Sequence, residues 1–295
     1  MGEFLREAYE KSKVRSYGLV LPEKIETREE GAEHLLGALG KPVINPSGDW
    51  TPYWPKGEKQ NRGFETNGCT VWATLNAIEA LINFKTGMIA NVFSVNYSDR
   101  YLANAAKFKG ILNPAIGADP HKIAELIRTV AGCLREDRLP WSDDIKTAAD
   151  FYDVQNLAEL MREGPRWYDE YILNHEWALR GGSKERELKD ALQRGAVCVS
   201  VQAWKYDGKV YVKPDPKSFD NHWTGLMRYD GSNPIVGDSY PESEGDFEKI
   251  LAPDYGFNIA KVFYLSEAKP TLNILQKILN VISEILRLDF LLLKK

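Results

Sequence analysis

Residues 67–73 read Asn67-Gly68-Cys69-Thr70-Val71-Trp72-Ala73, and they place a thiol directly before a long apolar stretch. No Gly or Pro interrupts this stretch before Gly87, so the pattern predicts a buried helix that begins at Cys69. A thiol reacts as its thiolate, and the positive end of a helix dipole favours that negative charge. The sequence therefore makes Cys69 a candidate nucleophile.

An imidazole and a carboxylate follow later in the chain. Asn221-His222-Trp223 opens one apolar strand pattern, and Val236-Gly237-Asp238 ends the next. The residues between these patterns, 229–234, are typical of a turn between antiparallel strands. We therefore expect His222 and Asp238 to meet, and an imidazolium close to Cys69 would lower the pKa of the thiol.

These residues resemble the papain-like cysteine peptidases, in which a Gln, the nucleophilic Cys, a His and an Asn or Asp follow one another along the chain. Asp49-Trp50 and Gln60 are similar to the Asp-Trp pair and the oxyanion-hole Gln that precede the family's Cys. Residues 188–201 resemble the helix, Gly turn and buried strand that lead toward its His, and residues 258–265 resemble its closing strand. The resemblance covers about residues 45–266.

The resemblance implies an α+β fold, with a helical half that carries the Cys, an antiparallel β half that carries the His and an active site in the cleft between them. It implies hydrolysis of peptide bonds through a Cys69-His222-Asp238 triad and a thioester intermediate, without a metal or an organic cofactor. The backbone N–H of Cys69 and the Gln60 amide would hold the oxyanion.

The resemblance also indicates residues that surround the triad. Tyr240 stands in Asp238-Ser239-Tyr240, where the family usually has Asn-Ser-Trp, so we expect its ring to shield the His222–Asp238 pair. Gly68, Asn221 and Tyr240 are the expected substrate-binding residues. The substrate would be a peptide or a protein.

The sequence departs from the family pattern at three places. Gln60 lies nine residues before Cys69, so the loop 61–66 must bulge outward if Gln60 is the oxyanion donor; Asn67 or a backbone amide could take that role instead. Trp72 does not directly follow the nucleophile, which is consistent with core packing. Asp238 replaces the usual Asn and gives the imidazole a charged acceptor, as in the transglutaminase-like and bacteriocin-processing branches of the superfamily.

Composition limits the class of ligand and the compartment. The 295 residues are 43% apolar and 27% charged, which is ordinary for a globular protein. The net charge is −4 and no basic cluster is interleaved with aromatics, so we expect no nucleic-acid ligand. Three cysteines exclude an all-disulfide framework, and Cys133 and Cys198 are expected to be buried free thiols. Such thiols suit a reducing compartment.

The chain divides into three parts. Residues 1–44 form an N-terminal extension with a predicted helix at 27–40, which is either a removable pro-segment or a permanent part of the domain. Residues 45–268 form the catalytic domain, with helices first and strands later. Since residues 1–20 lack the apolar core of a secretory signal, and the layout resembles bacterial and phage members of the family, we expect a cytoplasmic or phage-associated protein.

Helix and strand patterns alternate along the catalytic domain. The predicted helices begin at Ser98 and Asp119, cover about 155–163 and 166–179, and follow Ser183 as far as Arg194. The predicted strands are 196–203, 209–212, 222–228, 234–238 and 258–265. His34, His121 and His175 would lie in helices as surface or capping residues, and none has a partner at metal-ligand spacing. The acidic residues between 242 and 248 lack the order of a calcium loop, which favours a solvated loop.

The chain changes character after Pro270. Residues 269–295 have the pattern of an amphipathic helix with a wide apolar face, interrupted too often by polar groups for a bilayer span. This helix either packs on the catalytic domain or provides self-association or contact with a membrane surface. Two other functions also remain open, namely a transglutaminase-like acyltransferase with the same triad and a catalytically inactive binding module.

Overall fold

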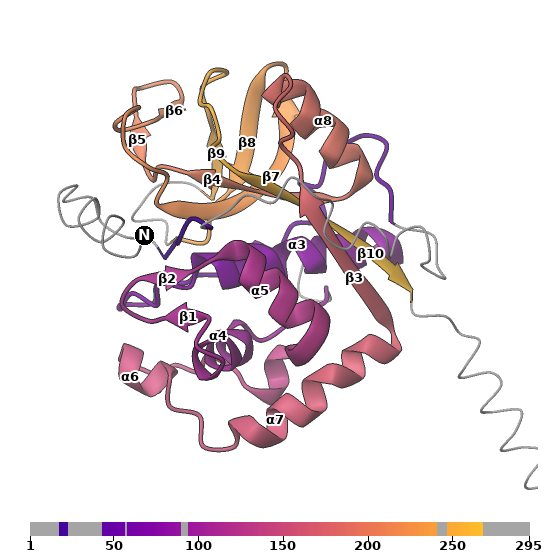
Figure 1. Cartoon of the computed structure of the whole chain (residues 1–295), viewed down its shortest axis with the longest axis vertical. Coiled ribbons are helices and arrows are strands. Elements are labelled where there is room, and N and C mark those ends of the chain that lie inside the picture. The colour runs from indigo at the N-terminus through magenta and orange to yellow at the C-terminus, as the bar shows by residue number, and fades with distance from the viewer. Residues whose placement is uncertain (1–17, 23–42, 57, 90–93, 241–246, 268–295) are drawn as a thin grey trace, which may run out of the picture.

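The helix that the sequence places after Gly68 is the centre of the fold. In the computed structural model, which describes residues 18–22, 43–56, 58–89, 94–240 and 247–267, this helix is α3, Cys69–Thr86. It ends at Gly87, whose φ of 70° lies in the left-handed region that favours glycine. The side chains of α3 are buried from Cys69 to Asn83, because it lies between a sheet and a group of shorter helices (Figure 1).

The shorter helices form the helical half of the molecule around α3. They are α4 (Asp99–Phe108), α5 (Pro120–Leu126), α6 (Ala148–Phe151) and α7 (Leu157–Glu163), with 3₁₀ helices η2 (Glu136–Arg138) and η3 (Gly164–Asp169). Two of them begin where predicted: Ser98 accepts a hydrogen bond from the Tyr101 N–H, and Asp119 accepts one from the His121 N–H. Beyond α5 the helix continues as a π-helix, η1 (Ile127–Ala131). The short strands β1 (Leu112–Asn113) and β2 (Gly117–Ala118) complete this half.

The second half is an antiparallel sheet with the order β3-β10-β4-β7-β8-β9 among the described residues. Its strands are β3 (Tyr171–Trp177), β4 (Ala196–Val201), β7 (His222–Asp230), β8 (Asn233–Gly237), β9 (Glu248–Ile250) and β10 (Ala260–Glu267). The predicted strands 196–203, 222–228, 234–238 and 258–265 are thereby confirmed. The predicted strand 209–212 contains only β6 (Tyr211–Val212), which pairs with β5 (Lys205–Tyr206).

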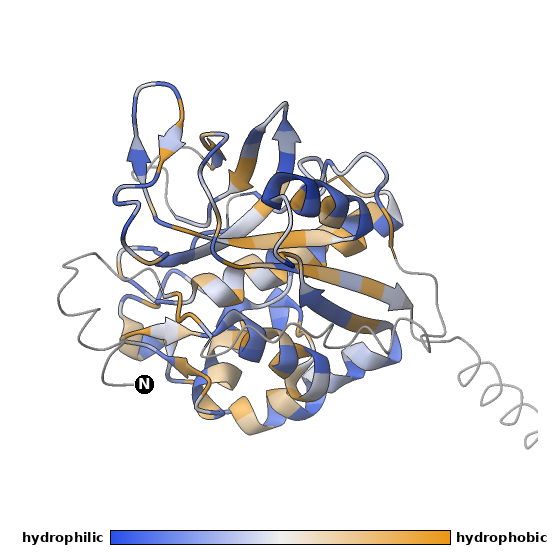
Figure 2. Ribbon diagram, turned by 45° about the horizontal axis from the view of Figure 1, so that its top comes forward, coloured by the Kyte–Doolittle hydropathy of each residue, from blue (hydrophilic) through white to orange (hydrophobic). Residues whose placement is uncertain are grey.

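Helix α8 (Lys184–Arg194) follows Ser183, as predicted, and packs on β4, β7 and β10. It is largely hydrophilic, whereas the strands beside it are largely hydrophobic (Figure 2). Its buried residues are Leu188, Ala191 and Leu192, so α8 uses one narrow apolar face and leaves its charged residues outside.

The predicted helix over 166–179 is wrong, because its second half is the edge strand β3. This strand pairs with β10 along its whole length, from Tyr171 opposite Glu267 to Trp177 opposite Lys261. His175 is buried and not a surface residue: its Nε2 lies 2.7 Å from Glu125 Oε1, and its Nδ1 lies 3.1 Å from Lys261 Nζ. Burial lowers the pKa of His175 to about 4, so the imidazole is neutral at pH 7.

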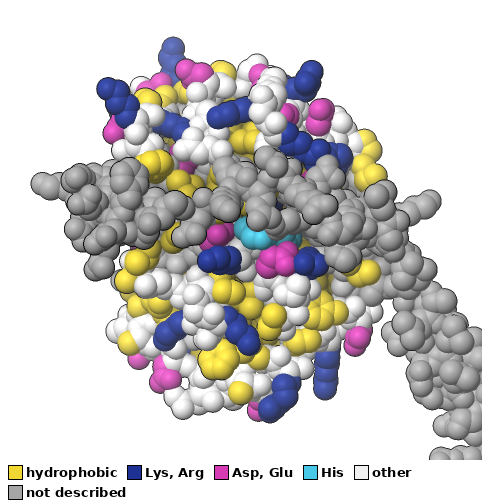
Figure 3. All heavy atoms as spheres, viewed as in Figure 1, with side chains coloured by type: hydrophobic (Ala, Val, Ile, Leu, Met, Phe, Trp, Pro, Cys, Tyr) yellow, Lys and Arg dark blue, Asp and Glu magenta, His cyan; other side chains and the backbone are white. Residues whose placement is uncertain are grey.

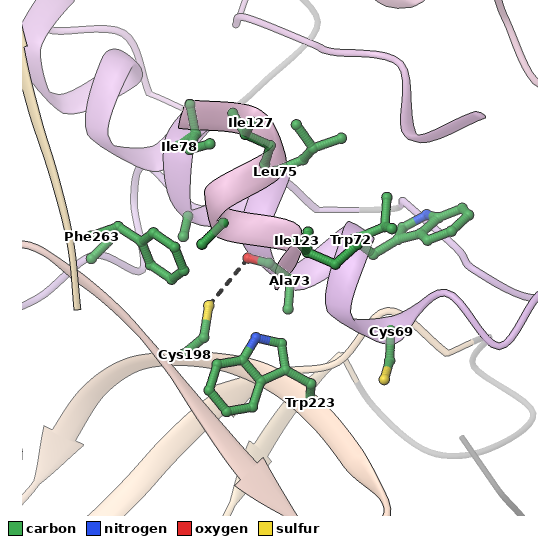
Figure 4. Close-up of a cluster of buried hydrophobic side chains, with 14 of the residues drawn as sticks. Cys69, Trp72, Ala73, Leu75, Ile78, Ile123, Ile127, Cys198, Trp223 and Phe263 are labelled. Carbon is green, nitrogen blue, oxygen red and sulfur yellow. Dashed lines mark hydrogen bonds between the residues drawn. The ribbon is translucent and has the colours of Figure 1, made fainter. Parts of the chain in front are cut away.

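The two halves meet in one apolar core (Figure 4). Cys198 of β4 donates a hydrogen bond to the carbonyl oxygen of Ala73 in α3, and the ring of Trp223 lies beside it. All three cysteines are described, and they are free and buried, as predicted for Cys133 and Cys198.

The lead-in to α3 is fastened to the sheet by two tryptophans. The backbone N–H of Trp50 donates to Met227 O over 2.9 Å, and its indole Nε1–H donates to Leu192 O over 2.8 Å. Trp54 lies against Gly225 of β7 so closely that any side chain at position 225 would clash with its ring. The Asp49-Trp50 segment is therefore an integral part of the fold.

Three predictions fall outside the described residues, namely the helix at 27–40 with His34, the acidic residues 242–246 and the helix after Pro270. In the part of the chain that the structure describes, no helix combines the length and the apolar character needed to cross a membrane.

Candidate active site

Cys69 is the first residue of α3, and its thiol is completely buried. Its sulfur points from the helix toward the strands (Figure 4). Gly68, the N-cap residue, lies against the Trp72 ring, where a Cβ would clash. Trp72 in turn stacks on Phe151, with ring centroids 6.0 Å apart. Trp72 is therefore a core residue, as the sequence indicated, and its packing accounts for a glycine before the thiol.

His222 and Asp238 meet at the ends of neighbouring strands. His222 is the first residue of β7, and Asp238 directly follows β8. The His222 Nε2 atom lies 3.0 Å from Asp238 Oδ1, and neither side chain is exposed. The backbone N–H of Tyr240 also donates to Asp238 Oδ1, over 3.3 Å. The contact between the imidazole and the carboxylate that the turn at 229–234 predicted is present.

A lysine that the sequence did not indicate completes the surroundings of the carboxylate. Lys249 Nζ of β9 lies 2.8 Å from Asp238 Oδ2, and the side chain of Lys249 is only 1% exposed. Burial alone would raise the pKa of Asp238, but the hydrogen bond and charge of His222, together with the Lys249 ammonium, lower it to about 2. Asp238 is therefore ionised at every pH at which the protein is expected to work.

The Cys69 thiol lies against the start of β7. Burial raises its pKa well above the usual value, and the negative charges of Glu65 and Asp238 act in the same direction. Hydrogen bonds from the backbone of Trp223, the residue after His222, and of Thr70 lower it. The expected lowering by the helix N-terminus is thus outweighed in this closed arrangement, in which water does not reach the sulfur.

Gln60 lies beside the residues that follow Asp238. Its backbone N–H donates to Ser239 O, its side-chain Nε2 donates to the Tyr240 hydroxyl over 2.9 Å, and its Oε1 accepts from the Ser239 hydroxyl over 2.7 Å. The intervening residues form a small loop closed by a bridge between Asn61 and Glu65. A loop that bulges in this way is the arrangement expected if Gln60 is the oxyanion donor.

Two aromatic rings enclose the imidazole of His222. The Tyr240 ring lies edge-on at 5.3 Å, in line with its expected shielding position, and the Trp204 ring lies at 5.8 Å. The Tyr240 hydroxyl donates to Glu65 Oε2 over 2.6 Å, which connects this cover to the loop before α3. Trp204 and Glu65 were not indicated by the sequence, since neither lies in a recognisable motif.

Asn221 and Asn67 are engaged with the backbone. Asn221 accepts a hydrogen bond from the Ala203 N–H over 3.0 Å and so ties the end of β4 to the start of β7. The Asn67 amide donates to Pro114 O over 2.7 Å, and its backbone φ is 52°. Asn67 therefore holds the chain just before Cys69 against the helical half.

A short N-terminal segment lies next to this position. Ala118 of β2 donates to Gly18 O and accepts from the Val20 N–H, each over 2.9 Å, which makes a parallel bridge to Leu19. Gly18 packs directly on the carbonyl oxygen of Asn67, where any side chain would clash, and its φ of 96° is in the region that favours glycine. Residues 18–22 thus lie beside the chain that leads into Cys69 (Figure 1).

The described residues offer neither a metal-ion cluster nor, on the face shown in Figure 3, an extended basic surface. Within the described ranges, no group of three or more His, Cys, Asp or Glu side chains is arranged to hold a metal ion. On the face shown in Figure 3, basic and acidic side chains of the described residues are interspersed, with no extended basic patch.

Comparison with known proteins identifies the fold. No protein-family model matches the chain, and no curated protein matches it. Among solved structures, it is similar to the cysteine protease and lectin-like domains of Cwp84, a surface layer associated protein of Clostridium difficile, with a TM-score of 0.55 and 13% identity over 90% of this chain and 60% of that one. It is also similar to the proform of the Amb a 11 cysteine protease, a ragweed pollen allergen, with a TM-score of 0.50 and 14% identity over 81% of this chain and 74% of that one.

These similarities show that the chain has the mixed helix and antiparallel sheet fold of papain-like cysteine proteases. The chain spans about 60% of the length of the Cwp84 structure that it matches. Because a shared fold does not establish a shared activity, function has to be argued from the site itself.

Proposed function

We propose that this protein is a papain-like cysteine peptidase that hydrolyses peptide bonds through Cys69, His222 and Asp238. The observation that carries the proposal is the buried His222–Asp238 contact of 3.0 Å, formed where β7 begins, next to Trp223, whose backbone hydrogen-bonds the Cys69 thiol. A thiol at a helix N-terminus, an imidazole and an orienting carboxylate are the groups that nucleophilic acyl transfer requires. The fold similarity to cysteine proteases supports the same reading.

The geometry supports a different role for each ring nitrogen of His222. Since Nε2 faces Asp238, proton exchange with the thiol falls to Nδ1. His222 takes the Cys69 proton, and the thiolate attacks the substrate carbonyl carbon to form a tetrahedral oxyanion. Collapse of this intermediate expels the amine, which receives the proton from His222, and leaves a thioester. Water activated by His222 then hydrolyses the thioester, which releases the acid and regenerates the thiol.

The oxyanion would be held by two donors near the nucleophile. The Cys69 backbone N–H, at the start of α3, is the first, and the Gln60 amide is the second. Gln60 Nε2 donates to the Tyr240 hydroxyl and to Glu65 Oε1, so substrate would replace one of these partners. Asn67 is a weaker candidate, because its amide is engaged with Pro114.

The proposed substrate is a peptide or a protein that approaches along Gly68, Asn221 and Tyr240. Access requires a change from the structure described, because the Cys69 thiol is completely buried. We propose that residues 18–22, as part of the extension 1–44, contribute to this closure. The segment after Pro270 is proposed for self-association or contact with a membrane surface.

Peptide mapping tests the activity. Purified protein is incubated with a peptide library, and the products are identified by mass spectrometry. Cleavage that is lost in Cys69→Ala and retained in Cys133→Ala, which changes another buried thiol, supports the proposal. Amine-coupled products in place of free acids, after addition of a primary amine, would instead indicate an acyltransferase. Equal cleavage by Cys69→Ala and wild type would refute the assignment of the nucleophile.

A further inference from the structure

The ion pair between Lys249 and Asp238 changes the charge that His222 faces. We propose that Lys249 is a positioning residue that neutralises the charge of Asp238. Asp238 then still accepts a hydrogen bond from His222, but the Asp238–Lys249 pair has no net charge, as an asparagine amide would have none. The catalytic consequence rests on the proposed peptidase function. The effect of the pair on the protonation of His222 rests only on the geometry of the His222, Asp238 and Lys249 side chains.

The strand register places Lys249 at this position. Lys249 is opposite Val236 in the pairing of β9 with β8, and the backbone N–H of Asp238 donates to Phe247 O over 2.9 Å. Because side chains alternate along a strand, Lys249 points inward, while Glu248 and Ile250 point outward and are more exposed. The backbone of β9 thus delivers the ammonium to the carboxylate oxygen that does not face His222.

Two aromatic rings also lie close to the ammonium. Its nitrogen lies 5.2 Å from the centre of the Trp204 ring and 5.4 Å from that of the Tyr211 ring. Tyr211 is fixed to the end of β9, because the Ala252 N–H donates to Tyr211 O over 2.9 Å. The same Trp204 ring packs against His222. Ring faces attract cations, so the two rings stabilise the ammonium and help to hold the Lys249 side chain in place.

Stability alone does not account for a charge at this position. Taking an ammonium out of water is costly, and a well-packed apolar pair is often as stable as a buried ion pair. The distinctive effect of Lys249 is therefore electrostatic. The negative charge of Asp238 raises the pKa of the Cys69 thiol, and the Lys249 ammonium lowers the pKa of Asp238. The charge of Asp238 alone would stabilise a protonated His222 and disfavour the Cys69 thiolate. An ammonium beside Asp238 weakens both effects.

The charges at the site predict the direction in which the pH–rate profile of each variant shifts. In Lys249→Met the site carries one extra negative charge, which favours the protonated forms of both His222 and Cys69, so both limbs of the pH–rate profile should move to higher pH. In Asp238→Asn the site loses the carboxylate charge that faces the ammonium, and both limbs should move to lower pH. The double variant Asp238→Asn/Lys249→Met removes one negative and one positive charge together and should return toward the wild-type profile. Shifts of about one pH unit are expected for charges this close.

Other titratable groups among the described residues face the same site. They include Glu65, which accepts from Tyr240 and acts on the Cys69 thiol, and the hydroxyls of Tyr240 and Tyr211. These groups are common to all four proteins of the cycle. Differences between the variants therefore report the Asp238–Lys249 pair.

The test combines pH profiles of kcat/KM with an NMR titration of the His222 ring in the full-length chain. Lys249→Arg keeps the charge and serves as the matched control, which should titrate like wild type. The NMR titration needs no peptidase activity: if wild type cleaves no peptide, the proposed function fails while the inference is still decided. Opposite shifts for Lys249→Met and Asp238→Asn, with recovery in the double variant, support it. Shifts in the same direction, or no shifts in the folded variants, would overturn the proposal. If Lys249→Met does not fold, the profiles of Lys249→Arg, Asp238→Asn and the double variant decide between these outcomes.

Discussion

The Nε2 atom of His222 lies 3.0 Å from Oδ1 of Asp238, with both side chains fully buried. The contact depends on backbone register, because Gly225 of β7 pairs with Gly237 of β8, and His222 and Asp238 lie beyond these partners at the same end of the strands. The two groups are therefore held by the ladder of the sheet rather than by a flexible loop. Such a pair fixes the orientation of the imidazole before any substrate binds.

Replacement of Asp238 tests this orientation. Asp238→Asn keeps an acceptor for the Nε2–H group and should retain most of the maximal rate, measured at its own pH optimum. Asp238→Ala removes the acceptor and leaves the tautomer unfixed, and we expect a loss in kcat of about 10²-fold or more. Equal and small losses in both variants would show that Asp238 does not orient His222.

Gln60 offers a test of the oxyanion site. Gln60→Ala should lower kcat by about 10²–10³-fold, the usual effect of removing one oxyanion donor. Tyr240→Phe removes a hydroxyl that accepts from Gln60 Nε2 and leaves the amide in place, so its effect should be only a few-fold. If both variants lose activity equally, Gln60 acts through the network with Tyr240 and Glu65 and not on the oxyanion.

The parts of the site that the sequence predicted are those with local patterns. The unbroken apolar run after Cys69 predicts α3, and two short strand patterns joined by turn residues predict the meeting of His222 and Asp238. Such signals depend on neighbouring residues and can be read without knowledge of the fold. Lys249 gave no comparable signal, because it follows an acidic stretch that is typical of a solvated loop, and its partners lie on other strands.

The incorrect helix over 166–179 has the same physical origin. His175 and Glu176 are polar, and in a single sequence they indicate an exposed face. In the fold their partners come from distant elements: Glu125 and Lys261 for His175, and Arg194, 2.6 Å away, for Glu176. A buried polar network is specified by tertiary contacts, and local propensity cannot reveal it.

A group of buried carboxyls predicts how stability depends on pH. Burial raises the pKa of Glu58 to about 8 and that of Glu79 well above its usual value, and Asp99 and Glu136 shift in the same direction. In the folded state Glu79 therefore holds a proton that the unfolded chain releases near pH 4.5. The stability it contributes is fully present below that pH and is lost as pH rises toward the folded pKa.

Glu79→Gln should remove this dependence, because an amide resembles the protonated carboxyl and its oxygen can still accept from the Tyr97 N–H. The quantity to compare is the free energy of unfolding of the variant minus that of wild type, measured by urea denaturation. We expect this difference to be larger at pH 8 than at pH 5. Glu185→Gln is the control, since Glu185 is exposed in an ion pair with Lys189. An identical difference at both pH values would show that Glu79 does not titrate between them.

The position of Gly18 predicts how access to the thiol can be opened. A methyl group at residue 18 would clash with the Asn67 carbonyl, two residues before Cys69, so Gly18→Ala should displace residues 18–22 from this position. The clash shifts the equilibrium of residues 18–22 toward the displaced position, and a tenfold shift requires only about 1.4 kcal/mol. Alkylation of Cys69 by iodoacetamide should therefore become about tenfold faster or more. The labelled residue is identified by peptide mapping, with Cys133 and Cys198 as internal references.

Gly110→Ala is the matched control, since Gly110 also has a positive φ, of 68°, but no atom within 4 Å of an added Cβ. Equal labelling of Cys69 in the two variants would show that residues 18–22 do not limit access to the nucleophile.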